Sequence, residues 1–155
     1  MKEKLQDYAL IAEIVGAAAV VISLIYVGLG VRQNTDAIQV ANHQALVAMD
    51  MDKNNWLRDP EFAAIYDNAR QDMDTLSPVE FRQYLTFVAD TLNAWGFAFI
   101  THNNGAMDDT IWNGWDGFYR VEMETEGFQR FWNDNPTFSP DFSSYVNSIL
   151  ATANN

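Results

Sequence analysis

The longest apolar stretch of the chain runs from Tyr8 to Val31, without proline and with a single charged residue, Glu13. A helix rises about 1.5 Å per residue, so the segment from Leu10 to Val31 extends roughly 33 Å and can cross a hydrocarbon core of about 30 Å. An isolated segment in lipid must satisfy its own backbone hydrogen bonds, which only a helix does. We therefore expect residues 8–31 to form a transmembrane helix after a polar N-terminus of residues 1–7.

A cleaved signal peptide is the alternative, because Lys2 and Lys4 form a basic start and residues 17–19 are alanines, as at a cleavage site. The apolar stretch continues for twelve residues beyond these alanines, whereas the apolar region of a signal peptide is shorter. We favour an uncleaved anchor. The two lysines before the span, against Arg32 after it, favour an N-terminus on the cytoplasmic side.

Small residues recur along the span at helical spacing and form one narrow stripe: Ala12, Gly16, Ala19, Ser23 and Gly30. Such stripes allow helices to approach closely in lipid, although glycine and alanine are common in membrane helices in general. Both interpretations stay open. Glu13 lies about one turn inside the apolar boundary. A functional role would give it a buried partner on another helix or a part in proton transfer. We favour the simpler interpretation, in which its side chain extends to the headgroups or is protonated.

Beyond the span the pattern is helical throughout. No glycine or proline interrupts Arg32 to Asp59, so residues 32–58 should extend the span as one helix. Asp59-Pro60 should end it and start another, since the residue before proline leaves the α region and Asp caps a helix. Further helices are expected at about 60–70, 78–101, from Asp108 or Asp109 onward, at 126–133 and from Pro140. The predicted class is all-α, with residues 59–155 forming an aromatic-rich, acidic helical domain.

The helix expected at about residues 78–101 should be the centre of this domain, because apolar residues cover much of its circumference. Ser77 and Glu80 are spaced to form a capping box at its start. Asn103-Asn104-Gly105 tolerates the left-handed turn that would end it. In the next helix, Gly114 and Gly117 lower helix propensity and suggest that another element packs closely there.

Charge is distributed very unevenly. The formal net charge is −12, and residues 33–155 contain 18 of the 21 acidic residues but only six of the nine basic ones. Such a domain repels phosphate backbones and anionic headgroups, so nucleic-acid binding is not expected. The absence of cysteine excludes disulfides, thiolate metal sites and covalent haem attachment, and we expect no cofactor.

One segment has the spacing of a calcium-binding loop, with oxygen side chains at positions one, three, five and twelve: Asp50, Asp52, Asn54 and Glu61. Asn55 replaces the usual glycine, and Arg58 would repel the ion. Because Pro60 is explained as a helix start, we favour a helix break over a metal site. Of the two histidines, His43 is expected on an exposed helix face and His102 as a C-terminal helix cap.

No hydrolase or phosphate-binding motif is present. Neighbouring acids such as Asp108-Asp109 or Glu122, Glu124 and Glu126 could serve acid–base chemistry, but such residues more often cap helices or face solvent, and we expect no enzyme. Four aromatic residues could form a docking surface or line a pocket. Alternatively they belong to the core of the domain, which is the interpretation we favour. They are Trp112, Trp115, Phe118 and Trp132.

The segments EIVGAAAVVISLIYVGLGVRQNT, DPEF and GFQRFWNDNPTFSPDFSSYV resemble an uncharacterised family of small bacterial proteins. Its members combine one N-terminal transmembrane helix, ending in an RQNT-type segment, with a Trp-rich helical domain. Phe131 replaces the first tryptophan of a Trp-Trp pair typical of that family, which suggests packing. The resemblance implies a bacterial inner-membrane protein but no activity.

Two functions follow as expectations. The first is a single-pass interaction protein with its C-terminal domain in the periplasm. It would be an accessory or assembly subunit that binds integral membrane proteins through its N-terminal helix, or a second copy of itself as a homo-oligomer. The second is a membrane-anchored ligand-binding or sensory module for a small ligand or Ca²⁺.

Overall fold

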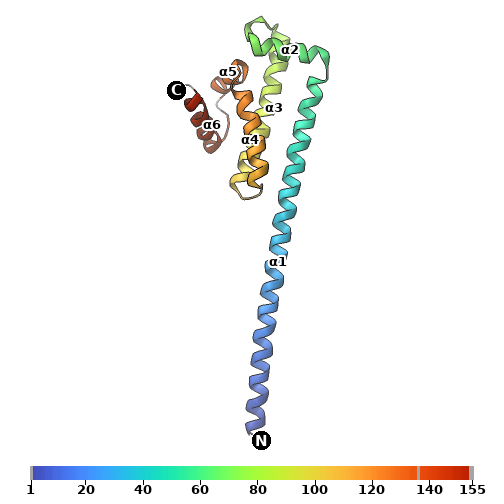
Figure 1. Ribbon diagram of the computed structural model, residues 1–155, viewed down its shortest axis with the longest axis vertical. Coiled ribbons are helices and arrows are strands. Elements are labelled where there is room, and N and C mark those ends of the chain that lie inside the picture. Colours follow the sequence, from blue (N-terminus) through green and yellow to red (C-terminus); the bar gives the residue numbers. More distant parts are fainter. Residues whose placement is uncertain (1, 136, 154–155) are drawn as a thin grey trace. The chain divides into compact units, whose positions relative to one another are not determined.

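The computed structural model describes residues 2–135 and 137–153, and within these ranges every regular element is a helix (Figure 1). The all-α prediction is confirmed. The elements are α1 (Lys2–Leu57), α2 (Pro60–Gln71), the 3₁₀ turn η1 (Met73–Thr75), α3 (Pro78–Asn103), α4 (Asp109–Met123), α5 (Glu126–Asp134) and α6 (Pro140–Ala153). The chain divides into two compact units, Met1–Ile38 and Gln39–Asn155.

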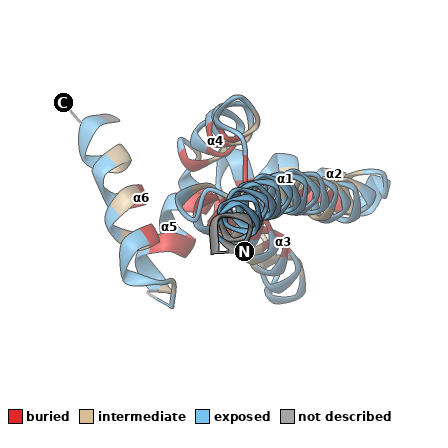
Figure 2. Cartoon of the chain, turned by 90° about the horizontal axis from the view of Figure 1, so that it is seen from below, coloured by how far each residue is buried: buried red, intermediate tan, exposed pale blue. Residues whose placement is uncertain are grey.

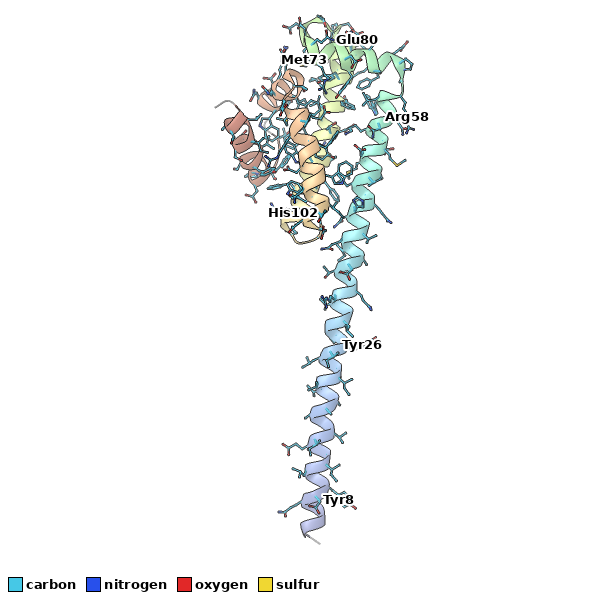
Figure 3. All side chains as sticks on the ribbon, viewed as in Figure 1. Tyr8, Tyr26, Arg58, Met73, Glu80 and His102 are labelled. Carbon is cyan, nitrogen blue, oxygen red and sulfur yellow. The ribbon has the colours of Figure 1, made fainter. Side chains whose placement is uncertain are left out.

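The first unit consists of the N-terminal part of α1. The large apolar side chains that the structure describes in this unit are all exposed, from 43% at Ile38 to 78% at Tyr26, and Figure 3 shows Tyr8 and Tyr26 near the two ends of the apolar stretch. The hydroxyl of Ser23 donates a hydrogen bond to the backbone carbonyl oxygen of Ala19, with an oxygen–oxygen distance of 2.9 Å. This polar group therefore needs no partner from outside the helix. Helix α1 is long and apolar enough to cross a membrane.

The second unit is built around α3. This helix buries residues on several sides, including Tyr84, Leu92 and Trp95, each no more than 1% exposed, and it contacts α2, α4, α5 and α6. Figure 2 shows buried residues along α3, α4 and α5. Full burial of one large apolar side chain contributes about 1.5–3 kcal/mol to the stability of the fold. The burial on several sides and the contacts with four helices confirm the predicted central position of α3.

The helix boundaries follow the capping chemistry expected from the sequence. Asp59 caps α2 by accepting a hydrogen bond from the backbone N–H of Glu61, with Pro60 in the first turn. Ser77 and Glu80 form the predicted capping box of α3, with distances of 2.8 Å from Ser77 N to Glu80 Oε2 and 3.4 Å from Glu80 N to Ser77 Oγ. Gly105 adopts a φ of 69° after α3, a conformation that glycine takes without strain.

Residues 39–57 of α1 belong to the second unit, which therefore begins before residue 59. Gln39 and Asn42 donate side-chain hydrogen bonds to the carbonyls of Gly105 and Ala106, at 3.2 Å and 3.0 Å. Leu46 is fully buried, and the ring of Trp56 packs edge-on against Phe62 of α2 at 5.1 Å. These contacts attach the end of α1 to the helices that follow it.

One local expectation was wrong, and one short turn was not expected. Among the described residues, no atom would lie within 4 Å of a Cβ at Gly114 or Gly117, so nothing in the chain uses the close approach that these glycines would allow. The segment between α2 and α3 contains η1, in which Met73 is 1% exposed. The sequence pattern did not reveal it, because one buried side chain in a short turn produces no periodicity.

Candidate functional site

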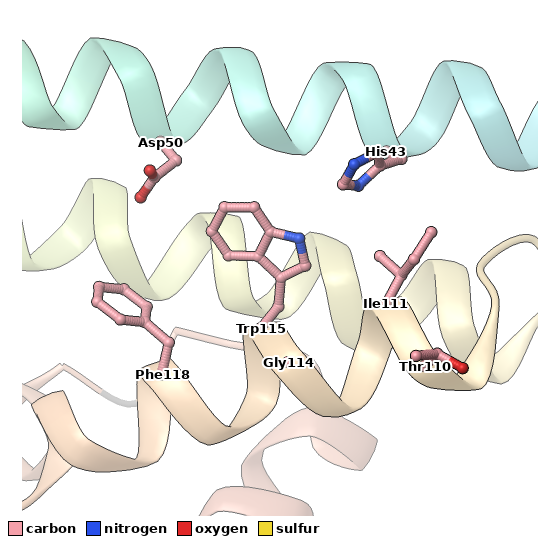
Figure 4. Close-up of a pocket in the computed structure, with 7 residues that line it drawn as sticks. All are labelled: His43, Asp50, Thr110, Ile111, Gly114, Trp115 and Phe118. Carbon is pink, nitrogen blue, oxygen red and sulfur yellow. The ribbon is translucent and has the colours of Figure 1, made fainter.

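A groove lies between residues 43–50 of α1 and residues 110–118 of α4 (Figure 4). Its volume is about 410 Å³, and it is open to solvent. We call it the α1–α4 groove and define it by its lining residues: His43, Asp50, Thr110, Ile111, Gly114, Trp115 and Phe118. All of them belong to the second unit.

Helical spacing explains why these side chains meet. Ile111, Trp115 and Phe118 are four and three residues apart, and His43 and Asp50 are seven apart, so each set occupies one face of its helix. Gly114 contributes no side chain and leaves the groove open at that point. Figure 4 shows the Trp115 indole projecting toward α1, with His43 and Asp50 on either side.

The acidic end of the groove is already neutralised by the chain itself. Lys53, 8% exposed, places Nζ 2.9 Å from Asp50 Oδ1 and 4.3 Å from the ring centroid of Phe118. Asn54 donates to the other carboxylate oxygen of Asp50 at 2.8 Å. Because both oxygens have partners and the ammonium is covered by an aromatic face, this end offers no free charge.

The other end contains two nitrogens for which the described residues supply no hydrogen-bond partner. His43 Nδ1 is enclosed and unpaired, so the predicted exposed position of His43 was wrong: the ring is partly buried against α4. The indole of Trp115 also makes no hydrogen bond to the described residues, whereas Trp95 and Trp132 donate theirs to Asp116 and Asn147, at 3.0 Å and 2.9 Å.

A second polar cluster surrounds Asp116, which is 7% exposed. Its Oδ1 accepts hydrogen bonds from Trp95 Nε1 at 3.0 Å and from Tyr145 Oη at 2.6 Å, and its Oδ2 accepts from Arg120 Nε at 2.7 Å. Burial, and then the hydrogen bond to Asp116, raise the pKa of Tyr145 to about 12. Every group in this cluster is paired, which indicates a structural role joining α3, α4 and α6.

Sequence reasoning missed Asp116, although a signal was present. Trp112, Asp116, Tyr119 and Met123 follow one another at spacings of four, three and four, so the acid interrupts the apolar stripe of α4 and shares its face. Arg120 lies four residues later, at ion-pair spacing. An acid on an apolar stripe with a cation one turn away predicts a buried pair.

Of the acids considered for acid–base chemistry, Glu122 is the one engaged in a partly buried cluster. It accepts a hydrogen bond from Tyr66 Oη at 2.9 Å and pairs with Arg70 at 3.3 Å. Burial, and then this carboxylate, raise the pKa of Tyr66 to about 12. Glu124 and Glu126 are exposed. Asp108 caps α4 by accepting from the backbone N–H of Thr110.

The aromatic set proposed as a docking surface is divided between two environments. Trp112 is 8% exposed and stacks on His102, with ring centroids 4.9 Å apart, and Trp132 is 7% exposed and stacks on Phe138 at 5.1 Å. Both belong to the core. Trp115 is partly buried and Phe118 is 41% exposed, and both line the α1–α4 groove.

His102 does not cap α3, contrary to the prediction. Its Nε2 lies 3.0 Å from Asp109 Oδ1, while backbone N–H groups of residues 104–106 donate to the last carbonyls of the helix. The short loop returns the chain closely enough for its own amides to reach these carbonyls, which leaves the imidazole free to stack on Trp112.

The calcium-loop spacing does not correspond to a loop. Asp50, Asp52 and Asn54 lie within α1, and only Glu61 lies beyond the break, in α2. The helix-break interpretation is confirmed by the Asp59 cap. Among the side chains that the structure describes, no three His, Asp or Glu residues come together as a metal site would require.

In the first unit, the small residues of the stripe are all exposed, and a Cβ at Gly16 or Gly30 would meet no atom of the described chain within 4 Å. Glu13 is exposed as well. Comparisons of the chain with models of known protein families, with curated proteins and with solved structures found no match.

Proposed function

We propose that the protein is a non-catalytic, single-pass membrane protein that acts as an accessory or assembly subunit of a larger membrane complex. The observation that carries this proposal is the apolar part of α1, in which every large apolar side chain from Leu10 to Val31 is more than half exposed. Apolar surface of this extent is stable only in lipid or against other apolar segments.

The second unit supports a role in contacts more than in chemistry. Four of its described acids are not exposed, and all are paired within the chain: Asp116 and Glu122 each with an arginine and a tyrosine hydroxyl, Asp50 with Lys53 and Asn54, and Glu80 with the backbone N–H of Ser77. None of the four is free to exchange protons with a substrate. The strongly acidic composition favours neutral or cationic partners over nucleic acid.

We place the protein in the inner membrane of a bacterial cell, with its N-terminus in the cytoplasm and residues 59–155 in the periplasm. The basic residues before the span and the resemblance of its segments to small bacterial membrane proteins support this placement. The chain lacks cysteine, so an Asn113→Cys variant carries one exposed thiol. A membrane-impermeant maleimide should label it in intact spheroplasts; labelling only after lysis would reverse the orientation.

The central test is affinity purification through a C-terminal tag after gentle solubilisation of native membranes. We expect one integral membrane protein in stoichiometric amount. The control is a variant in which the five stripe residues of the span are leucine, which keeps the anchor but removes the small-residue face. Recovery of the tagged chain alone, or of the same partner with both chains, would contradict association through the span.

A further inference from the structure

The α1–α4 groove combines apolar walls with hydrogen-bonding groups that the chain does not use. Ile111, Trp115 and Phe118 supply the walls, and Gly114 leaves space between them. Binding sites for small molecules are typically apolar concavities with a few polar groups that fix orientation. The volume of about 410 Å³ falls within the usual range for such sites, roughly 300–1,000 Å³.

The hydrogen-bonding group that the groove offers to a ligand is the indole N–H of Trp115, at the His43 end. The nitrogen-bearing edge of the Trp115 indole faces His43 across the groove (Figure 4), and this N–H has no acceptor in the described chain. His43 Nδ1 is enclosed without a partner. The Trp115 N–H is not enclosed, so a ligand oxygen in the groove can replace water as its acceptor, whereas the enclosed His43 Nδ1 has no surface that a ligand could reach.

The charges around the groove indicate a neutral ligand. A cation finds no free carboxylate, because Lys53 and Asn54 occupy both oxygens of Asp50. An anion is disfavoured by the second unit, whose residues 39–155 include 17 acidic and six basic ones. The exposed faces of Trp115 and Phe118 favour a flat ring, since aromatic rings stack on one another or meet edge to face.

We propose that the α1–α4 groove binds a neutral, planar ring compound carrying a carbonyl oxygen. The ring packs against Trp115 and Phe118, and the oxygen accepts a hydrogen bond from the Trp115 indole N–H at the His43 end of the groove. This site is independent of the association through the span, because its residues all belong to the second unit.

The test uses the full ¹⁵N-labelled chain in detergent, with coumarin as the carbonyl-bearing probe and naphthalene as the probe without an oxygen. The indole N–H signals of the five tryptophans are followed by NMR, and Trp115→Phe identifies the signal of Trp115. We expect coumarin to shift that signal saturably, and naphthalene to bind about five- to tenfold more weakly, as the loss of about one hydrogen bond implies.

Two matched variants test the location. Gly114→Leu fills the groove and should abolish the shift, whereas Gly117→Leu makes the same change in the same helix outside the groove and should preserve it; neither new side chain begins against an existing atom. Equal affinity for the two probes would overturn the role of the carbonyl. The absence of a saturable shift, or identical responses of the two variants, would overturn the site.

Discussion

The indole nitrogen of Trp95 donates a hydrogen bond to Asp116 Oδ1 at 3.0 Å, deep in the second unit. The two residues come from α3 and α4, and Tyr145 of α6 donates to the same oxygen at 2.6 Å. One carboxylate thus connects three helices. Because Arg120 pairs with its second oxygen, the charge is balanced where it is buried.

Replacing Asp116 should therefore be costly. Asp116→Ala leaves the Trp95 N–H and the Tyr145 hydroxyl without their acceptor, and we expect the free energy of unfolding to fall by about 2–4 kcal/mol. Chemical denaturation followed by near-ultraviolet circular dichroism measures this loss. Asp67→Ala, at an exposed position of α2, should change the free energy by less than about 0.5 kcal/mol. Equal effects of the two substitutions would show that the cluster contributes nothing specific.

Gly127 permits α5 to approach the central helix. A Cβ at this buried position would lie 2.6 Å from Tyr84 Cε1 and 2.8 Å from Cζ, so Gly127→Ala should destabilise the protein by about 1–3 kcal/mol. Gly117→Ala is the control: it meets no atom within 4 Å, and we expect it to stabilise helix α4 by up to about 1 kcal/mol. Thermal unfolding distinguishes the two, and a stabilising Gly127→Ala would contradict the close approach.

Stability should depend on alkaline pH through the buried tyrosines. Burial and neighbouring carboxylates raise the pKa values of Tyr66 and Tyr145 to about 12, above the ordinary value of about 10. A raised pKa stabilises the folded state below pH 10, and this stabilisation is lost as the pH rises from about 10 to 12. The free energy of unfolding should fall over that interval.

Absorbance at 295 nm during a pH titration reports the same groups, which should ionise later than free tyrosine. The double variant Tyr66→Phe, Tyr145→Phe should be less stable at neutral pH, because it loses both hydroxyl hydrogen bonds, and less sensitive between pH 10 and 12. An equally steep loss of stability in this variant would assign the alkaline transition to other groups.

The small-residue stripe remains a prediction that Gly16 can test. Gly16→Leu should reduce the size of the complex in mild detergent if helices pack along the stripe, because a leucine prevents close backbone approach. Gly28→Leu is the matched control: it lies twelve residues later on a different face, and like Gly16 it meets no atom of the described chain. An unchanged complex size in Gly16→Leu, measured by size-exclusion chromatography with light scattering, would exclude the stripe.

The helical class and several helix boundaries were determined by local chemistry. The Asp59-Pro60 cap, the Ser77–Glu80 capping box and the left-handed Gly105 each depend on residues a few positions apart, which the sequence displays directly. The apolar span and the many-sided burial of α3 follow in the same way from periodicity and length.

The tertiary structure alone decided which side chains from distant segments meet. Three contacts depend on how the helices pack: His43 and Trp115 share a groove, Phe118 covers the Lys53–Asp50 pair, and Asp116 connects α3 to α6. Periodicity assigns a residue to a face of its helix but does not say what covers that face. For the same reason the sequence grouped Trp112 and Trp132 with Trp115 and Phe118, whereas packing placed the first two in the core.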